Sequence, residues 1–137
     1  MSSNIFTDST LGELRWDSRV NWWAGRFQAF QLYIHARTPD RLISTEARQA
    51  LARIAGDDSA IRRRAADGLL EILNSTWNDG EPIGTEEFMR RMSPDGIVVY
   101  ERGRADVSYH DDDMFLGHSI SVRIAPDGTF IEALIEG

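Results

Sequence analysis

The fold is decided by the stretch Val107-Ser-Tyr-His-Asp-Asp-Asp-Met-Phe-Leu-Gly-His118-Ser-Ile-Ser-Val-Arg-Ile124. In it, two segments of alternating apolar and polar residues lie on either side of an acidic run. Successive side chains of a strand point to opposite faces, so His118 shares a face with the apolar residues at every second position that follows it. In the first segment Tyr109 faces the core and His110 the solvent. Gly117 gives the chain the freedom to turn back. The stretch therefore predicts two paired strands, with His118 turned inward and His110 outward.

The acidic run Asp111, Asp112 and Asp113 between the two histidines admits two interpretations. These carboxylates could bind a metal together with His110 and His118. The spacing lacks the glycine and glutamate of a calcium loop and the paired histidines of a zinc protease helix. The other interpretation is a solvated connection whose charges prevent edge pairing, with His118 bound to a backbone carbonyl. We favour this connection, because an unpatterned acidic run is seldom a site.

The length and composition restrict which kinds of protein this can be. The 137 residues fit one domain, 1–137, long enough to bury roughly two-thirds of its unfolded surface. The absence of cysteine excludes a disulfide scaffold, thiol catalysis and cysteine-based zinc sites. The N-terminus has no signal-peptide pattern, and no apolar run reaches the roughly 18 residues of a membrane helix. We therefore expect a cytoplasmic protein with no membrane association and no cofactor.

The net charge of −7 is concentrated near the C-terminus. Residues 95–137 contain nine acidic and three basic residues, a local net charge of −6. Such a surface repels phosphate backbones, which argues against nucleic-acid binding. It would suit a basic protein partner.

Turn signals and hydrophobic periodicity predict the order of the elements. Strands are expected over 6–17, 21–25, 27–36, 97–102, 105–110, 118–125 and 129–135. Helices are expected from Ser44 or Thr45 to Gly56, from Asp57 or Asp58 to Trp77, and from Thr85 to Met92. A turn is expected at 93–96, and the two partly apolar faces of the last strand suggest an inner strand or a covered one.

This order predicts an α+β fold: two antiparallel β-meanders, about seven strands in all, flanking a helix pair and a short third helix. A sandwich of two stacked meanders is the alternative. Gly68 within the second helix costs about 1 kcal/mol relative to alanine, so close packing is expected there.

Two neighbouring tryptophans are candidate partner-binding residues. Trp22 and Trp23 follow one another in a predicted strand, so they point to opposite faces and one of them can be exposed. An exposed tryptophan is a good binding anchor. Together with Glu101 they form the predicted partner-binding set. All three of Trp22, Trp23 and Trp77 could line a ligand groove, but a place in the core is favoured for Trp77.

The chain has no phosphate-binding loop, nucleophile elbow or zinc-protease motif. Its recognisable segments are Phe6 to Trp16, Trp22 to Gly25, Leu70 to Trp77, Thr85 to Phe88, Asp112 to Ile120, and Asp127-Gly128. With these segments the chain resembles a bacterial family of uncharacterised proteins, domain of unknown function family 2262. The resemblance implies a stand-alone bacterial α+β domain and supplies no catalytic residue. Small acidic bacterial proteins of this kind include toxin-neutralising partners.

Two functional hypotheses follow. The first is a non-catalytic, immunity-like protein-binding module that uses the acidic face of the C-terminal sheet around Asp111–Asp113 and Glu101. The second is a metal-binding protein or hydrolase with its site at residues 110–118.

Overall fold

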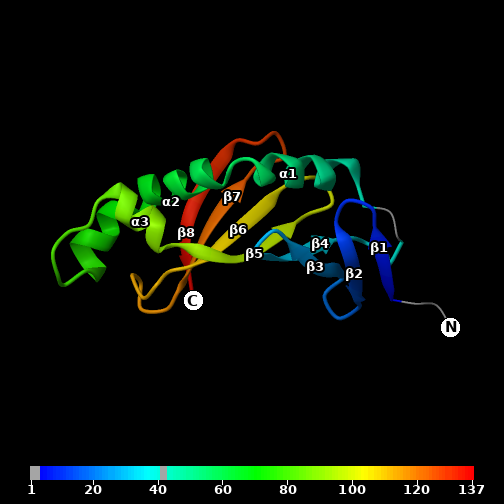
Figure 1. Ribbon diagram of the computed structural model, residues 1–137, viewed down its shortest axis with the longest axis horizontal. Helices are drawn as coiled ribbons and strands as arrows, with labels where there is room; N and C mark the ends of the chain where they lie inside the picture. The colour runs from blue at the N-terminus through cyan, green and yellow to red at the C-terminus, as the bar shows by residue number, and fades with distance from the viewer. Residues whose placement is uncertain (1–3, 41–42) are drawn as a thin grey trace.

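The computed structural model describes residues 4–40 and 43–137. Within these residues eight strands form one sheet, and their spatial order follows the order along the chain (Figure 1). The strands are β1 (Ile5–Asp8), β2 (Gly12–Asp17), β3 (Trp22–Phe27), β4 (Phe30–His35), β5 (Ser93–Val99), β6 (Ala105–His110), β7 (Ser119–Ile124) and β8 (Phe130–Glu136). All neighbours are antiparallel except β4 and β5, which run parallel. The predicted α+β class is confirmed, and the alternative of stacked meanders is wrong because the meanders join edge to edge.

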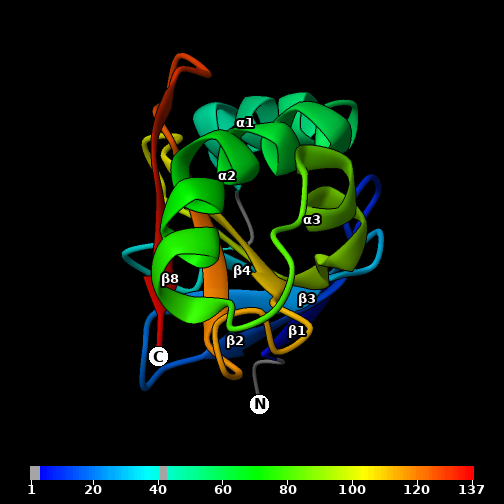
Figure 2. The same ribbon diagram turned by 90° about the vertical axis from the view of Figure 1, so that its left-hand side faces the viewer.

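The helices lie between β4 and β5, where a parallel pair requires a crossover connection. They are α1 (Thr45–Ala55), α2 (Asp58–Ile72), a π-helical turn η1 (Leu73–Trp77) that continues α2, and α3 (Thr85–Arg91). The hydroxyl of Ser44 accepts the backbone N–H of Ala47 at 3.1 Å and caps α1, as predicted. Figure 2 shows the sheet curving around the helices, which cover one of its faces. No helix in the described ranges is long and apolar enough to cross a bilayer.

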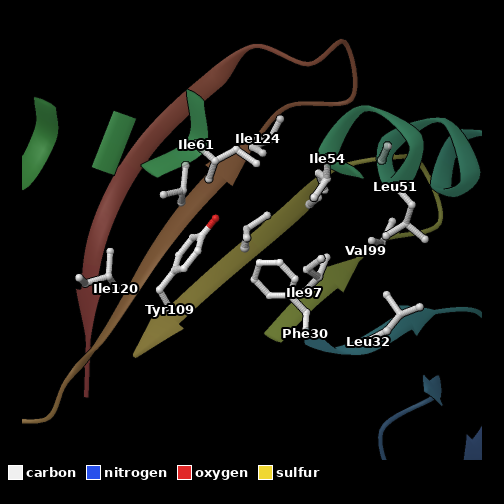
Figure 3. Close-up of a cluster of buried hydrophobic side chains, with 14 of the residues drawn as sticks. Phe30, Leu32, Leu51, Ile54, Ile61, Ile97, Val99, Tyr109, Ile120 and Ile124 are labelled. Carbon is white, nitrogen blue, oxygen red and sulfur yellow. The ribbon is translucent and has the colours of Figure 1, made fainter. Parts of the chain in front are cut away.

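The core lies between this helical layer and the inner face of the sheet (Figure 3). Its sheet side is built by strand residues at every second position, and its helix side by one apolar stripe. Fully buried members include Leu32, Leu51, Ile61, Ile97, Tyr109 and Ile120. Each fully buried aliphatic side chain contributes roughly 1.5–3 kcal/mol to folding, so this layer accounts for much of the stability.

The N-terminal strands are divided more finely than the sequence predicts. Residues 6–17 form a hairpin, because the Asp8 carboxylate accepts the backbone N–H groups of Thr10 at 3.0 Å and Leu11 at 2.9 Å and fixes a turn. The predicted strand 27–36 begins only at Phe30, since Gln28 has a φ of 55° and reverses the chain after β3.

The turn predicted at 93–96 is wrong, because β5 starts at Ser93. A β-bulge between Pro94 and Gly96 accommodates the proline within the strand. Of the two alternatives for the last strand, an inner position is wrong, since β8 ends the sheet. The other alternative, a covered strand, is confirmed where β8 packs against α2: a Cβ on Gly68 would lie 3.2 Å from the Cβ of Ala133, whereas Ile131 is 53% exposed. The close packing expected at Gly68 is confirmed.

Candidate functional site

The sheet face opposite the helices, here called the uncovered face, carries an aromatic patch consisting of Trp22, Tyr33, His35 and Tyr100. The rings of Trp22 and Tyr33 are 4.6 Å apart, and those of His35 and Tyr100 are stacked at 5.5 Å. All four side chains are partly exposed. The patch extends from β3 across β4 to the residue that follows β5, and none of the helices in the described residues covers it.

Two of the predicted partner-binding residues lie at this patch. Trp22 belongs to it, and Glu101 follows Tyr100 directly. The Glu101 carboxylate is 3.6 Å from Arg37, and its backbone carbonyl accepts the Ser44 hydroxyl at 2.6 Å. These contacts keep Glu101 at the rim of the patch.

Trp23 cannot serve as a partner contact, which corrects the sequence-based set. It is 1% exposed and packs edge-on against Phe6 and Trp16, with ring centroids at 4.8 and 5.3 Å. The opposite orientation expected for two successive tryptophans is confirmed, with Trp22 as the accessible member.

The C-terminal half of the uncovered face contains more carboxylates than guanidinium groups. Its acidic members are Asp95, Asp106, Glu132 and Glu136, beside Glu101, and its basic members are Arg104 and Arg123. Part of this charge is compensated internally. Asp106 lies 3.4 Å from Arg104 and 4.0 Å from Arg123, and Arg123 lies 3.1 Å from Glu132. The remaining excess is negative.

The acidic loop at residues 111–118 is organised from within by its first residue. Asp111 is 5% exposed, and its carboxylate accepts the backbone N–H groups of Asp113, Phe115 and Gly117 at 3.1, 2.8 and 3.1 Å. Gly117, with a φ of 88°, turns the chain as expected. Asp111 is therefore a structural acceptor in this loop, and its charge does not face a partner.

The two histidines of the loop have separate partners. His118 is half-buried, its Nδ1–H donates to the carbonyl of Phe115 at 2.6 Å, and its ring lies 5.7 Å from Trp77. The predicted bond to a backbone carbonyl is confirmed. His110 is 63% exposed on the uncovered face, 3.5 Å from Asp95. In the described ranges, no three His, Asp or Glu side chains gather in a way that could hold a metal ion.

The acidic loop packs against the helical layer. Arg91 of α3 donates from Nε to the Asp112 carboxylate at 2.9 Å and from Nη2 to its carbonyl at 2.8 Å. Phe115 meets Trp77 edge-on at 5.6 Å. Between η1, α3 and the loop lies a polar pocket of about 120 Å³, here called the Trp77 pocket.

Glu101 and the acidic loop lie at opposite ends of β6. Six residues separate these ends, which corresponds to about 20 Å at roughly 3.3 Å per residue. The single acidic surface predicted around Asp111–Asp113 and Glu101 is therefore two separate regions.

Sequence reasoning missed a partly buried polar cluster at the start of α2. The Tyr109 hydroxyl donates to the Asp58 carboxylate at 2.8 Å, and Arg62 donates to the same group at 2.8 Å. Arg62 also donates to the carbonyls of Met89 and Met92. Burial raises the pKa of Tyr109 far above its ordinary value, so the phenol stays neutral. The available signal was a tyrosine on the core face of a strand, whose hydroxyl needs a partner.

Comparison with curated proteins and with solved structures gave no match. A family model matches residues 8–135, nearly the whole chain. Apart from Phe6 and Thr7, the segments that carry the resemblance lie within this range. The chain therefore belongs to the family described as "Uncharacterized protein conserved in bacteria (DUF2262)".

Proposed function

We propose that this protein is a non-catalytic protein-binding module that contacts a basic partner through the uncovered face of its sheet. The observation that supports this most is the aromatic patch beside an excess of carboxylates on a face without helices. Partly exposed aromatic rings act as binding anchors, because they bury a large area with little loss of conformational freedom.

The charges around the patch fit a basic partner. Glu101 and the acidic members of β6 to β8 lie on one side of the rings, where Arg104 also packs on Tyr100 at 4.3 Å, and such rim charges steer a protein of opposite sign and accelerate association. Because they stay solvated, their attraction weakens as salt is added. A neutralising, immunity-like role toward a basic toxin is one form that such binding would take.

The alternative of a metal or hydrolase site at 110–118 has less support. The Asp111 carboxylate is occupied by three backbone N–H groups, and the two histidines face different neighbours. No contact in the loop favours a second function.

The proposal is tested with the immobilised full chain and proteins from the source cell, washed at low and high salt. A true partner is basic, is retained at low salt and is released as salt rises. Trp22→Ala and Glu101→Arg each weaken its retention, because the first removes an anchor and the second reverses a rim charge.

Glu71→Arg is the matched control, since Glu71 is an exposed acidic residue of α2 on the opposite side of the molecule. It makes the same charge change and leaves retention unaltered. Retention that is insensitive to salt, recovery of nucleic acid alone, or equal effects of Glu71→Arg and Glu101→Arg would contradict the proposal.

A further inference from the structure

We propose that the Trp77 pocket is a binding site for one cationic side chain, arginine above all, of a basic protein partner. The pocket holds about 120 Å³ between η1, α3 and the acidic loop. It is lined by Leu73, Trp77, Asn78, Asp79, Arg91, Asp113 and Met114. This inference rests on the proposed function, because it concerns the same class of partner at a second place on the molecule.

The lining is mostly polar, with one aromatic side chain. Leu73 and Met114 are only 2% and 5% exposed, so the partly buried Trp77 is the main ring available beside the carboxylates. Asp79 and Asp113 supply carboxylates at the edge. Arginine keeps its guanidinium near charge and aromatic rings, so its chemistry matches this lining.

The carboxylates of the pocket are available to a ligand. Within the described part of the chain, neither Asp79 nor Asp113 has an ion-pair partner, and neither carboxylate accepts a hydrogen bond. Arg91, which also lines the pocket, is directed elsewhere. It donates to Asp112 at 2.9 Å and lies 3.9 Å from Glu87. Its charge is compensated, so the pocket remains attractive to a cation.

Local structure holds the two carboxylates in place. The backbone N–H of Asn78 closes the π-helical turn on the carbonyl of Leu73 at 2.8 Å, and its side chain donates to Glu81 and accepts from Gly80, at 2.9 Å each. These bonds fix the turn that carries Asp79. On the other side, the N–H of Asp113 is bound by the Asp111 carboxylate at 3.1 Å. A π-helical turn is a common accompaniment of functional sites.

The test uses the ¹⁵N-labelled full chain titrated with N-acetyl-arginine amide and, separately, with its neutral analogue N-acetyl-citrulline amide. The arginine probe is expected to shift the Trp77 indole signal and the amides of Asp79 and Asp113 saturably, with a Kd on the order of millimolar for so small a ligand. The citrulline probe, of the same shape without charge, is expected to leave them unmoved.

Asp79→Asn and Asp113→Asn should each weaken arginine binding about two- to fivefold, the effect of losing one exposed ion pair. Asp67→Asn, an exposed carboxylate of α2, is the matched control and should bind like the wild type. Equal response to citrulline, shifts spread over all acidic surfaces, or no response would overturn the inference.

The two proposals fail separately. A salt-sensitive partner that depends on Trp22, found with a chain that does not bind the arginine probe, would leave the proposed function standing and remove the pocket. If the chain binds the arginine probe saturably but no basic partner is found, the pocket remains a cation-binding site and the proposed function is contradicted.

Discussion

At the scale of single residues, the Asp111 carboxylate accepts three backbone N–H groups of its own loop. Asp111→Ala leaves these donors unpaired in a largely buried place, so the free energy of unfolding should fall by about 2–3 kcal/mol. Asp113→Asn is the control: its side chain is exposed, and asparagine tolerates its left-handed φ of 60°, so the change should stay within about 0.5 kcal/mol. Urea denaturation measures both. A loss with Asp111→Ala no larger than with the control would contradict the structural role.

Asp8 gives a second prediction at this scale, through its pH dependence. Arg48 donates to its carboxylate, with one contact at 3.2 Å, and this bond is the main reason that the pKa of Asp8 lies well below its ordinary value of 3.8. A pKa that is lower in the folded state stabilises the fold above the ordinary value, and this contribution is lost as pH falls below it. The wild type should therefore lose stability below about pH 4.

Asp8→Asn should lower the free energy of unfolding by about 1–2 kcal/mol at neutral pH, because the charge of Asp8 is lost while its amide oxygen can still cap the turn. The difference between the two chains should shrink as pH falls from 5 to 2. Unfolding curves at each pH measure this difference. A constant difference across that range would show that the ion pair contributes nothing that depends on protonation.

At the scale of elements, α2 and β8 meet at Gly68 and Ala133. Gly68→Leu places a large side chain where even a Cβ lies 3.2 Å from its neighbour, so α2 must move away from the sheet. The expected loss is about 1–3 kcal/mol, as for overpacked sites. Adding Ala133→Gly should recover part of it. The wild type, the two single variants and the double variant form a double-mutant cycle measured by urea denaturation. If the two changes in unfolding free energy simply add, residues 68 and 133 do not interact, which would contradict the contact.

The elements also differ in how far the sequence predicted them. The strand over 105–110 and that over 118–125 were predicted within one residue, because alternation is a local pattern. The sequence did not predict the change from α-helix to a π-helical turn at Leu73, because a slightly wider turn hardly alters the spacing of the apolar residues.

At the scale of the whole molecule, the parallel pairing of β4 with β5 joins the two meanders into one sheet over one core. We therefore expect the part of the chain that forms this sheet and its helical layer to unfold as one cooperative unit. Three of the four tryptophans, Trp16, Trp22 and Trp23, lie in β2 and β3, so tryptophan fluorescence reports mainly on the N-terminal strands, whereas far-UV circular dichroism reports chiefly on the helices. Their urea transitions should coincide. Two separated transitions would mean that the meanders fold independently.

For the candidate sites too, the sequence identified individual residues, but the distances between them depend on the tertiary structure. The sequence identified Trp22 and Glu101, and the structure places them together because β3, β4 and β5 are neighbours. It also grouped Glu101 with Asp111–Asp113, which β6 holds apart. Distances of this kind depend on which strands pair, and composition does not carry that information.

The sequence by itself determined the α+β class, the order of most elements, the inward turn of His118 and the acidity of the C-terminal third, since each follows from local periodicity or from counting charges. Only the tertiary structure decided that the meanders share one sheet, that Asp111 is a buried acceptor, and that Trp77 lines a pocket with Asp79 and Asp113. These features arise from pairing and packing between residues far apart in the chain, where the free energy depends on the final three-dimensional arrangement.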